Sequence, residues 1–143
     1  MSTRSYDAAN VTLSFMGAVI DSGFADGEFC TVEQDAADFE KVVGTDGEVT
    51  RYPTHNRAAK ITVKLLQSSQ GNAKLSAINL IDVTVGNGAG IGPMIIRDRG
   101  GSSIYTAAHC WIAKPPDFKF DRAPTPREWT LECADLVRVD GGN

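Results

Sequence analysis

Any chemistry in this chain would rest on a small set of side chains, chiefly two histidines and three cysteines. His55 and His109 lie far apart, and no ligand spacing connects them, so they are a weak hypothesis for a metal site. Cys30, Cys110 and Cys133 are odd in number and have no C-x-x-C spacing. This pattern favours buried, reduced thiols over a disulfide framework or a zinc site. We therefore expect no metal and no cofactor.

One short motif suggests a reaction. The stretch Thr106-Ala107-Ala108-His109-Cys110 is identical to the histidine box of trypsin-like serine proteases. Their mechanism needs a nucleophilic serine beside an oxyanion hole and a buried carboxylate that orients the imidazole. Residues 110–143 contain no serine, and 143 residues are too few for the two barrels of that family. We therefore interpret the motif as a coincidence and predict that the chain is not an enzyme.

The same motif also fits a β-strand from Ile104 to Ala113, with alternate residues on opposite faces. On this interpretation one face packs inward and consists of Ile104, Thr106, Ala108, Cys110 and Ile112. The other face would carry an aromatic ladder of Tyr105, His109 and Trp111, in which the imidazole is an ordinary hydrogen-bonding ring.

The glycine-rich stretch from Gly86 to Gly92 suggests a phosphate-binding loop. No frame in it matches G-x-G-x-x-G, and Pro93 leads from it into a β-prone run instead of a helix. We therefore expect a mobile connection or an interface loop at this position.

The distribution of charge is more informative than the net charge of −4. Residues 1–50 carry ten acidic side chains against two basic ones, whereas residues 51–143 carry twelve basic against eight acidic ones, so the two parts have charges of −8 and +4. The acidic total argues against a surface that grips nucleic acid. This uneven distribution of charge fits either two parts that fold against each other or copies that stack head to tail.

The length of 143 residues fits a single domain, and 14 glycines and 6 prolines indicate many turns between short elements. No run approaches the roughly 20 apolar residues of a membrane helix. The first seven residues also lack the apolar centre of a secretory signal. We therefore expect a protein made in the cytoplasm that has no membrane partner.

Alternating apolar residues predict most of the strands. A strand from Val11 to Ile20 and a second from Glu28 to Glu33 would form a hairpin, and Arg57 to Gln67 gives the clearest alternation. Met94 to Arg99 would pair with Ile104 to Ala113. Further strands are predicted around Lys119, between two phenylalanines, and from Arg127 to Leu136, where Trp129, Leu131 and Cys133 would point inward.

One further hairpin has the pattern of a projecting arm. The β-prone runs Phe39 to Val43 and Glu48 to Tyr52 flank Thr45-Asp46-Gly47, whose Asp-Gly pair suits a tight turn. The faces of these runs mix charged and apolar residues instead of separating them, as expected for an arm that leaves the body and meets a partner. We expect this arm to span residues 38–56.

The only helix is predicted over residues 69–82. Ser68 or Ser69 would cap it, and Leu75, Ile78 and Ile81 would form one apolar stripe against the sheet. The whole chain is thus predicted to be a mainly β single domain: an antiparallel sandwich or partly open barrel of about eight strands with a flanking helix and a projecting hairpin arm. Residues 1–9 would form an N-terminal arm and residues 139–143 a frayed end.

Four segments, in this order and spacing, resemble tail tube proteins of contractile-tailed bacteriophages, which are related to the inner tube of type VI secretion. The likeness runs from about Val11 to Leu136. The segments are Gly23-Phe24-Ala25-Asp26-Gly27-Glu28-Phe29-Cys30, Phe39-Glu40-Lys41-Val42-Val43-Gly44-Thr45-Asp46-Gly47-Glu48, Gly92-Pro93-Met94-Ile95-Ile96-Arg97-Asp98-Arg99 and Arg127-Glu128-Trp129.

This resemblance implies a structural subunit of a virion tail. Six copies would close into a ring, and rings would stack into a hollow tube inside a contractile sheath. Partners would be the sheath, baseplate and tail-terminator proteins. Six subunits of charge −4 would give −24 per ring, and an acidic lumen would let DNA pass without specific binding.

The resemblance also places contacts between rings on the arm. The residues expected to make them are Phe39, Glu40, Lys41, Val42, Val43, Asp46, Glu48, Arg51 and Tyr52. Two alternatives stay open. One is a small β-barrel that binds a ligand in its interior, and the other is the tube of a phage-derived bacteriocin or another injection device.

Overall fold

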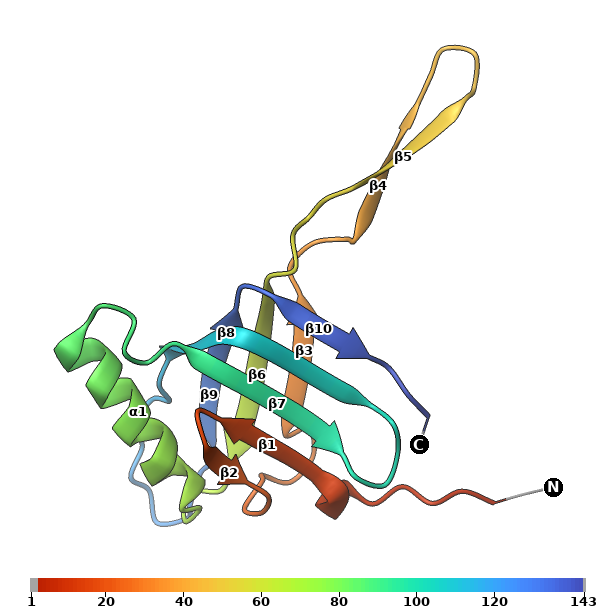
Figure 1. Cartoon of the computed structure of the whole chain (residues 1–143). Coiled ribbons are helices and arrows are strands. Elements are labelled where there is room, and N and C mark those ends of the chain that lie inside the picture. Colours follow the sequence, from red (N-terminus) through yellow and green to blue (C-terminus); the bar gives the residue numbers. More distant parts are fainter. Residues whose placement is uncertain (1–2, 143) are drawn as a thin grey trace.

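The computed structural model describes residues 3–142, which form one curved eight-stranded sheet, a separate two-stranded hairpin and one α-helix (Figure 1). In chain order the elements are the 3-10 helix η1 (Ala8–Asn10), β1 (Val11–Phe15), β2 (Ala18–Ile20), β3 (Cys30–Gln34), β4 (Phe39–Val43), β5 (Val49–Pro53), β6 (Ala59–Leu65), α1 (Gly71–Val85), β7 (Gly92–Asp98), β8 (Ile104–Lys114), β9 (Arg127–Cys133) and β10 (Leu136–Val139).

The large sheet is antiparallel and has the order β2-β1-β7-β8-β9-β6-β3, with β10 added beside β8. The long strand β8 is its centre, because the first half pairs with β10 and the second half with β9. Buried side chains from β1, β6, β7, β8 and β9 form one cluster, so the sheet curls around a single core. The mainly β prediction with a flanking helix and a hairpin arm is confirmed.

The clearest alternation in the sequence gives the best-buried strands. In β6 the side chains of Ala59, Ile61, Val63 and Leu65 are almost completely buried, and Lys60 between them is exposed. The neighbouring strand β9 buries Trp129, Leu131 and Cys133 in the same way, as predicted. Strict alternation is expected for strands with one face on a core and the other in solvent.

The predicted faces of β8 are correct only in its second half. Ala107 and Cys110 are both buried although they are three positions apart in the sequence, and the pairing of β8 with β7 shifts its register at this point. A β-bulge at Ala108 and His109 therefore changes which residues point inward. Ala108 is exposed, contrary to the prediction, and Tyr105 packs against the core instead of joining an aromatic ladder with His109.

The prediction of one strand from Val11 to Ile20 is wrong. Met16 and Gly17 both have positive φ, of 50° and 84°, and form a tight turn between β1 and β2. Glycine at position 17 lowers the cost of this turn, because a left-handed conformation is costly for other residues, and Met16 alone adopts it as a non-glycine residue in this turn. The predicted hairpin partner is also wrong, since β3 pairs with β6 and not with β1.

The helix α1 begins two residues later and ends three residues later than predicted. The Oγ of Ser69 accepts the N–H of Gly71 at 3.2 Å, and a Cβ at Gly71 would lie 3.1 Å from Leu65 Cδ1, so glycine lets the helix start close to the sheet. Leu75 is fully buried, whereas Ile81 is 51% exposed. The predicted stripe therefore contacts the body only in the first half of the helix.

The strand predicted around Lys119 is also wrong, because residues 115–126 contain no strand. Four prolines in this segment remove backbone donors that a sheet would need (Pro115, Pro116, Pro124 and Pro126). Near the C-terminus, the Oγ of Ser103 donates to the carbonyl of Gly141 at 3.0 Å and accepts its N–H at 3.1 Å. Residues 1, 2 and 143, at the two ends for which an arm and fraying are predicted, lie outside the described residues.

Among residues 3–142, no helix combines the length and the apolar character that a membrane crossing requires; α1 itself has 15 residues.

Candidate assembly surface

The hairpin of β4 and β5 is a two-stranded ribbon that extends far from the body of the molecule (Figure 1). Every residue from 37 to 53 is exposed. Its register pairs Phe39 with Pro53 and Val43 with Val49, so that these residues share one face with Lys41 and Arg51. The opposite face carries Glu40, Val42, Thr50 and Tyr52.

Side chains order each face of this arm. On the first face the guanidinium carbon of Arg51 lies 4.2 Å from the ring centroid of Phe39, in cation–π geometry. On the second face the hydroxyl of Tyr52 donates to Oε2 of Glu40 at 2.9 Å. This hydrogen bond, together with the charge of Glu40, raises the pKa of Tyr52. Cross-strand pairs of this kind fix the register of a ribbon that has no core.

The tip of the arm is a compact acidic turn. Oδ1 of Asp46 accepts the backbone N–H of Glu48 at 3.1 Å, and Gly44 donates to the carbonyl of Glu48 at 2.7 Å. Gly47 has a φ of 89°, which agrees with the predicted Asp-Gly turn.

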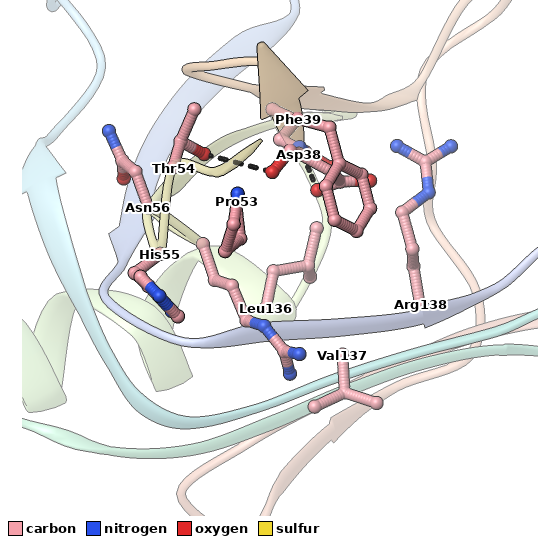
Figure 2. Close-up of a pocket in the computed structure, with 11 residues that line it drawn as sticks. Asp38, Phe39, Pro53, Thr54, His55, Asn56, Leu136, Val137 and Arg138 are labelled. Atoms are coloured by element: carbon pink, nitrogen blue, oxygen red, sulfur yellow. Dashed lines mark hydrogen bonds between the residues drawn. The ribbon is translucent and has the colours of Figure 1, made fainter. Parts of the chain in front are cut away.

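Polar contacts close the base of the arm and join it to β3; Figure 2 shows residues at this base. Thr54 bonds to the carbonyl of Asp38 through its N–H at 3.0 Å and through its hydroxyl at 3.2 Å. Gln34, from the end of β3, donates to Oδ1 of Asp38 at 2.7 Å. Beside these residues a cavity of about 390 Å³ separates the arm from Leu136 and Arg138 of β10.

All nine residues predicted to make contacts between rings therefore lie on the arm, where none is buried within the subunit. Phe39, Val42 and Val43 are 48%, 56% and 59% exposed. The sequence interpretation missed Val49, which is 58% exposed and extends the apolar face that Phe39 and Val43 form. The spacing of two residues between Val49 and Arg51 was the signal, because it places both side chains on this face.

A second apolar surface lies on α1 and beside it. Leu80, Val83 and Val85 are more than 65% exposed on the helix. In the neighbouring segment Phe118 and Phe120 are more than 80% exposed and stack on each other with their centroids 6.4 Å apart. The sequence interpretation missed this surface, although a Phe-x-Phe pattern between two pairs of prolines is an unusual signal.

The histidine box does not form a catalytic site. His109 Nδ1 lies 3.0 Å from Asp135 Oδ2, but both side chains are at the surface, with 67% and 40% exposure. A catalytic dyad of this type needs a buried carboxylate and an adjacent serine nucleophile. Within residues 3–142 the imidazole is hydrogen-bonded to Asp135 and to no serine.

The three cysteines are free thiols; Cys110 and Cys133 are buried, and Cys30 is half-buried. Burial raises the pKa of Cys30 to about 11 and that of Cys110 to about 12. Thiols with such pKa values carry little thiolate near neutral pH, and the thiolate is the form that acts as a nucleophile. The described part of the chain also has no group of three histidine, cysteine or acidic side chains that could hold a metal ion.

Residues 1–141 match the family described as the Bacteriophage PhiTE tail tube protein. This chain belongs to that family. The "Structural protein ORF10" of Pseudomonas phage KPP10 is a similar protein, 30% identical over 122 residues that cover 85% of this chain and 70% of the relative. The chain is thus a structural, non-enzymatic protein of the virion tail, and the resemblance to tail tube proteins is confirmed.

Solved structures confirm the fold of this tail tube protein. The sheath/tube terminator of an extracellular contractile injection system aligns over 98% of this chain and 100% of its own, with a TM-score of 0.61 and 11% identity. A chain of a native gene transfer agent particle aligns over 95% of this chain and 100% of its own length, with a TM-score of 0.60 and 8% identity. A chain of the sheath-tube complex of a contractile injection system aligns over 94% of this chain and 91% of its own length, with a TM-score of 0.58 and 14% identity.

Proposed function

We propose that this tail tube protein closes into rings of six copies and that the rings stack into a hollow tube through which DNA passes. The observation that carries the proposal is the arm of residues 38–56, in which every residue except the half-buried Thr54 is exposed. A two-stranded ribbon without a core is marginally stable in water. Its open edges leave backbone N–H and C=O groups unpaired, and its apolar side chains are in solvent, so binding to a partner surface would stabilise it.

The polarity of charge supports stacking in a fixed direction. The first 50 residues, which include the arm up to Thr50, carry −8, and the rest of the chain carries +4. Copies that associate head to tail bring unlike charges together, whereas head-to-head contact opposes like charges. A ring of net charge −24, for six copies at −4 each, would also repel DNA and so keep it from adhering to the lumen.

The expected partners are those of a contractile tail: a sheath outside the tube, a baseplate at one end and a terminator at the other. Similar folds occur in a sheath/tube terminator and in a sheath-tube complex. We expect the protein to be made in the cytoplasm of the host bacterium. An infective phage, a phage-derived bacteriocin or another injection device would each use such a tube.

Negative-stain electron microscopy of the purified protein tests this proposal. Rings with sixfold class averages, or tubes, are the expected result. Isolated globules, with a monomeric mass by light scattering at high concentration, would contradict it and favour the alternative of a small ligand-binding barrel.

The role of the arm is tested separately. Phe39→Asp should shorten the tubes, because it places a charge on the apolar face of the ribbon. Replacement of residues 44–48 by Asn-Gly, which keeps a tight turn but removes the acidic tip, should do the same. Met16→Asp, in the exposed turn between β1 and β2, is a matched control. Tubes of unchanged length in both arm variants would show that the arm makes no contact between rings.

A further inference from the structure

Phe118 and Phe120 are the most exposed aromatic rings among the described residues, at 83% and 82%. Their planes are nearly parallel, at 11°, so they present one continuous apolar patch. Covering a phenylalanine stabilises a protein by more than covering most other side chains. Two such rings side by side in a protein that builds a tail indicate a surface that is covered after assembly.

The two rings border a preformed groove between α1 and the segment 115–126. Its cavity is about 370 Å³, and its walls include Ala73 and Ser76 of the helix. The floor is rigid, because the indole N–H of Trp129 donates to Asn72 Oδ1 at 2.9 Å. The groove therefore exists before any partner binds.

Polar contacts also hold the wall that carries the phenylalanines. Arg127 is only 7% exposed, and its Nη2 donates to the carbonyl of Lys119 at 3.0 Å. Its guanidinium carbon lies 5.8 Å from the ring centroid of Phe120. On the other side, Gln67 Oε1 accepts the N–H of Thr125 at 3.0 Å.

The arm and the groove lie at opposite ends of the same strand. The chain returns from the arm into β6 at Ala59, whereas the far end of β6, Leu65, pairs with Arg127, where the segment 115–126 ends. Seven extended residues separate these ends by roughly 20 Å. Figure 1 shows the arm pointing away from the end at which α1 begins and this segment lies.

The two surfaces are also complementary in character. Residues 38–56 carry four acidic and two basic side chains, so their net charge is −2. Residues 114–127 carry four basic and two acidic ones, so their net charge is +2. Each surface has exposed apolar side chains as well, chiefly Phe39, Val43 and Val49 on one face of the arm.

We propose that the groove between α1 and residues 115–126 receives the arm of a second copy of this chain in the next ring. The face of the arm with Phe39 and Val43 covers Phe118 and Phe120, and its acidic tip approaches Lys119 and Arg122. Because donor and acceptor surfaces are at opposite ends of one subunit, each added ring exposes a new acceptor, and stacking can continue without limit. This inference rests on the proposed function, which requires that rings stack.

Photocrosslinking of the full chain tests the contact directly. Phe118→p-benzoylphenylalanine is assembled from a mixture of 15N-labelled and unlabelled subunits, irradiated and digested. Mass spectrometry should find crosslinks to peptides of residues 39–53 that join one labelled and one unlabelled chain. The control Val19→p-benzoylphenylalanine, in β2, should give no crosslink to these peptides.

The outcomes separate the two proposals. Tubes whose crosslinks from position 118 reach only other segments, or a co-expressed sheath protein, overturn the inference and leave the tube function intact. An absence of rings and tubes in the wild-type protein overturns the tube function itself. If the variant at position 118 does not assemble, Val43→p-benzoylphenylalanine probes the same contact from the arm and should reach residues 115–121.

Charge reversal gives a second readout. Lys119→Glu with Arg122→Glu should shorten tubes about fivefold, because like charges then meet at the contact. Adding Asp46→Lys and Glu48→Lys to the same chain should restore the length to within about twofold. A combined variant with tubes no longer than those of its Lys119→Glu, Arg122→Glu parent would contradict the inference.

Discussion

His109 Nδ1 lies 3.0 Å from Oδ2 of Asp135, and Oδ1 of the same carboxylate accepts the backbone N–H of His109 at 3.1 Å. Asp135 stands between β9 and β10, and His109 belongs to the bulge of β8. One carboxylate therefore satisfies a backbone donor that the bulge leaves without a ladder partner. The contact resembles part of a catalytic triad, but its position indicates a structural role.

Removing this carboxylate should destabilise the subunit. Asp135→Ala leaves the N–H of His109 without its partner, at a cost of about 1 kcal/mol at an exposed site. Asp135→Asn retains an acceptor oxygen and should cost less. Urea unfolding at pH 7 measures both variants, and equal effects would show that the backbone hydrogen bond contributes nothing.

The contribution of the Asp135 charge should depend on pH. Partial burial acts to raise the pKa of Asp135, but the hydrogen bonds from His109 and its charge outweigh this and hold the pKa below the ordinary 3.8. A lowered carboxyl pKa stabilises the folded state above the unfolded pKa, and the stabilisation is lost as pH falls through the folded value. The stability difference between wild type and Asp135→Asn should therefore shrink below pH 3.8. A difference that grows in acid would contradict this assignment.

The tyrosine on the arm can report on the register of the hairpin. The hydrogen bond to Glu40 and the carboxylate charge raise the pKa of Tyr52, so Glu40→Gln should lower it towards the ordinary value. Absorbance at 295 nm during alkaline titration measures the shift. Glu48→Gln, at the tip, is the matched control and should leave the titration of Tyr52 unchanged.

The side-chain amide of Asn72 links α1 to Trp129 of β9 and to Leu66. Asn72 Oδ1 accepts the indole N–H of Trp129, and Asn72 Nδ2 donates to the carbonyl of Leu66 at 2.9 Å. Asn72→Ala should cost about 1–3 kcal/mol, because a buried indole donor loses its partner. Asn79→Ala, on the same helix, should cost much less. Chemical unfolding followed by tryptophan fluorescence measures both.

The thiols should react slowly in the folded protein. Burial raises the pKa of Cys30 to about 11 and of Cys110 to about 12, and it also raises the pKa of Cys133. At pH 8 little thiolate is then available to attack Ellman's reagent. We expect all three to react promptly in denaturant and slowly without it. A thiol that reacts at the same rate in both conditions would not be buried in solution.

Local patterns were sufficient for elements whose surroundings are uniform along their length. The alternation in residues 57–67 predicted β6, and the Asp46-Gly47 turn predicted the arm, because each pattern reflects one buried face or one turn geometry. The same rule failed at Met16-Gly17 and at the bulge of β8. In both places a local change of backbone conformation exchanges which residues point to the core and which to solvent. The residue types nevertheless still fit a continuous strand.

Residue order alone was enough to predict the class of the protein: mainly β, without catalytic machinery, and with a charged hairpin that no core of its own can cover. These properties follow from residue types and short spacings. The contacts between distant residues, such as His109 with Asp135 and Asn72 with Trp129, became known from the folded chain. The tertiary structure also decided that the arm and the exposed Phe118 lie at opposite ends of β6, because strand order and register depend on packing across the whole chain and not on local preference.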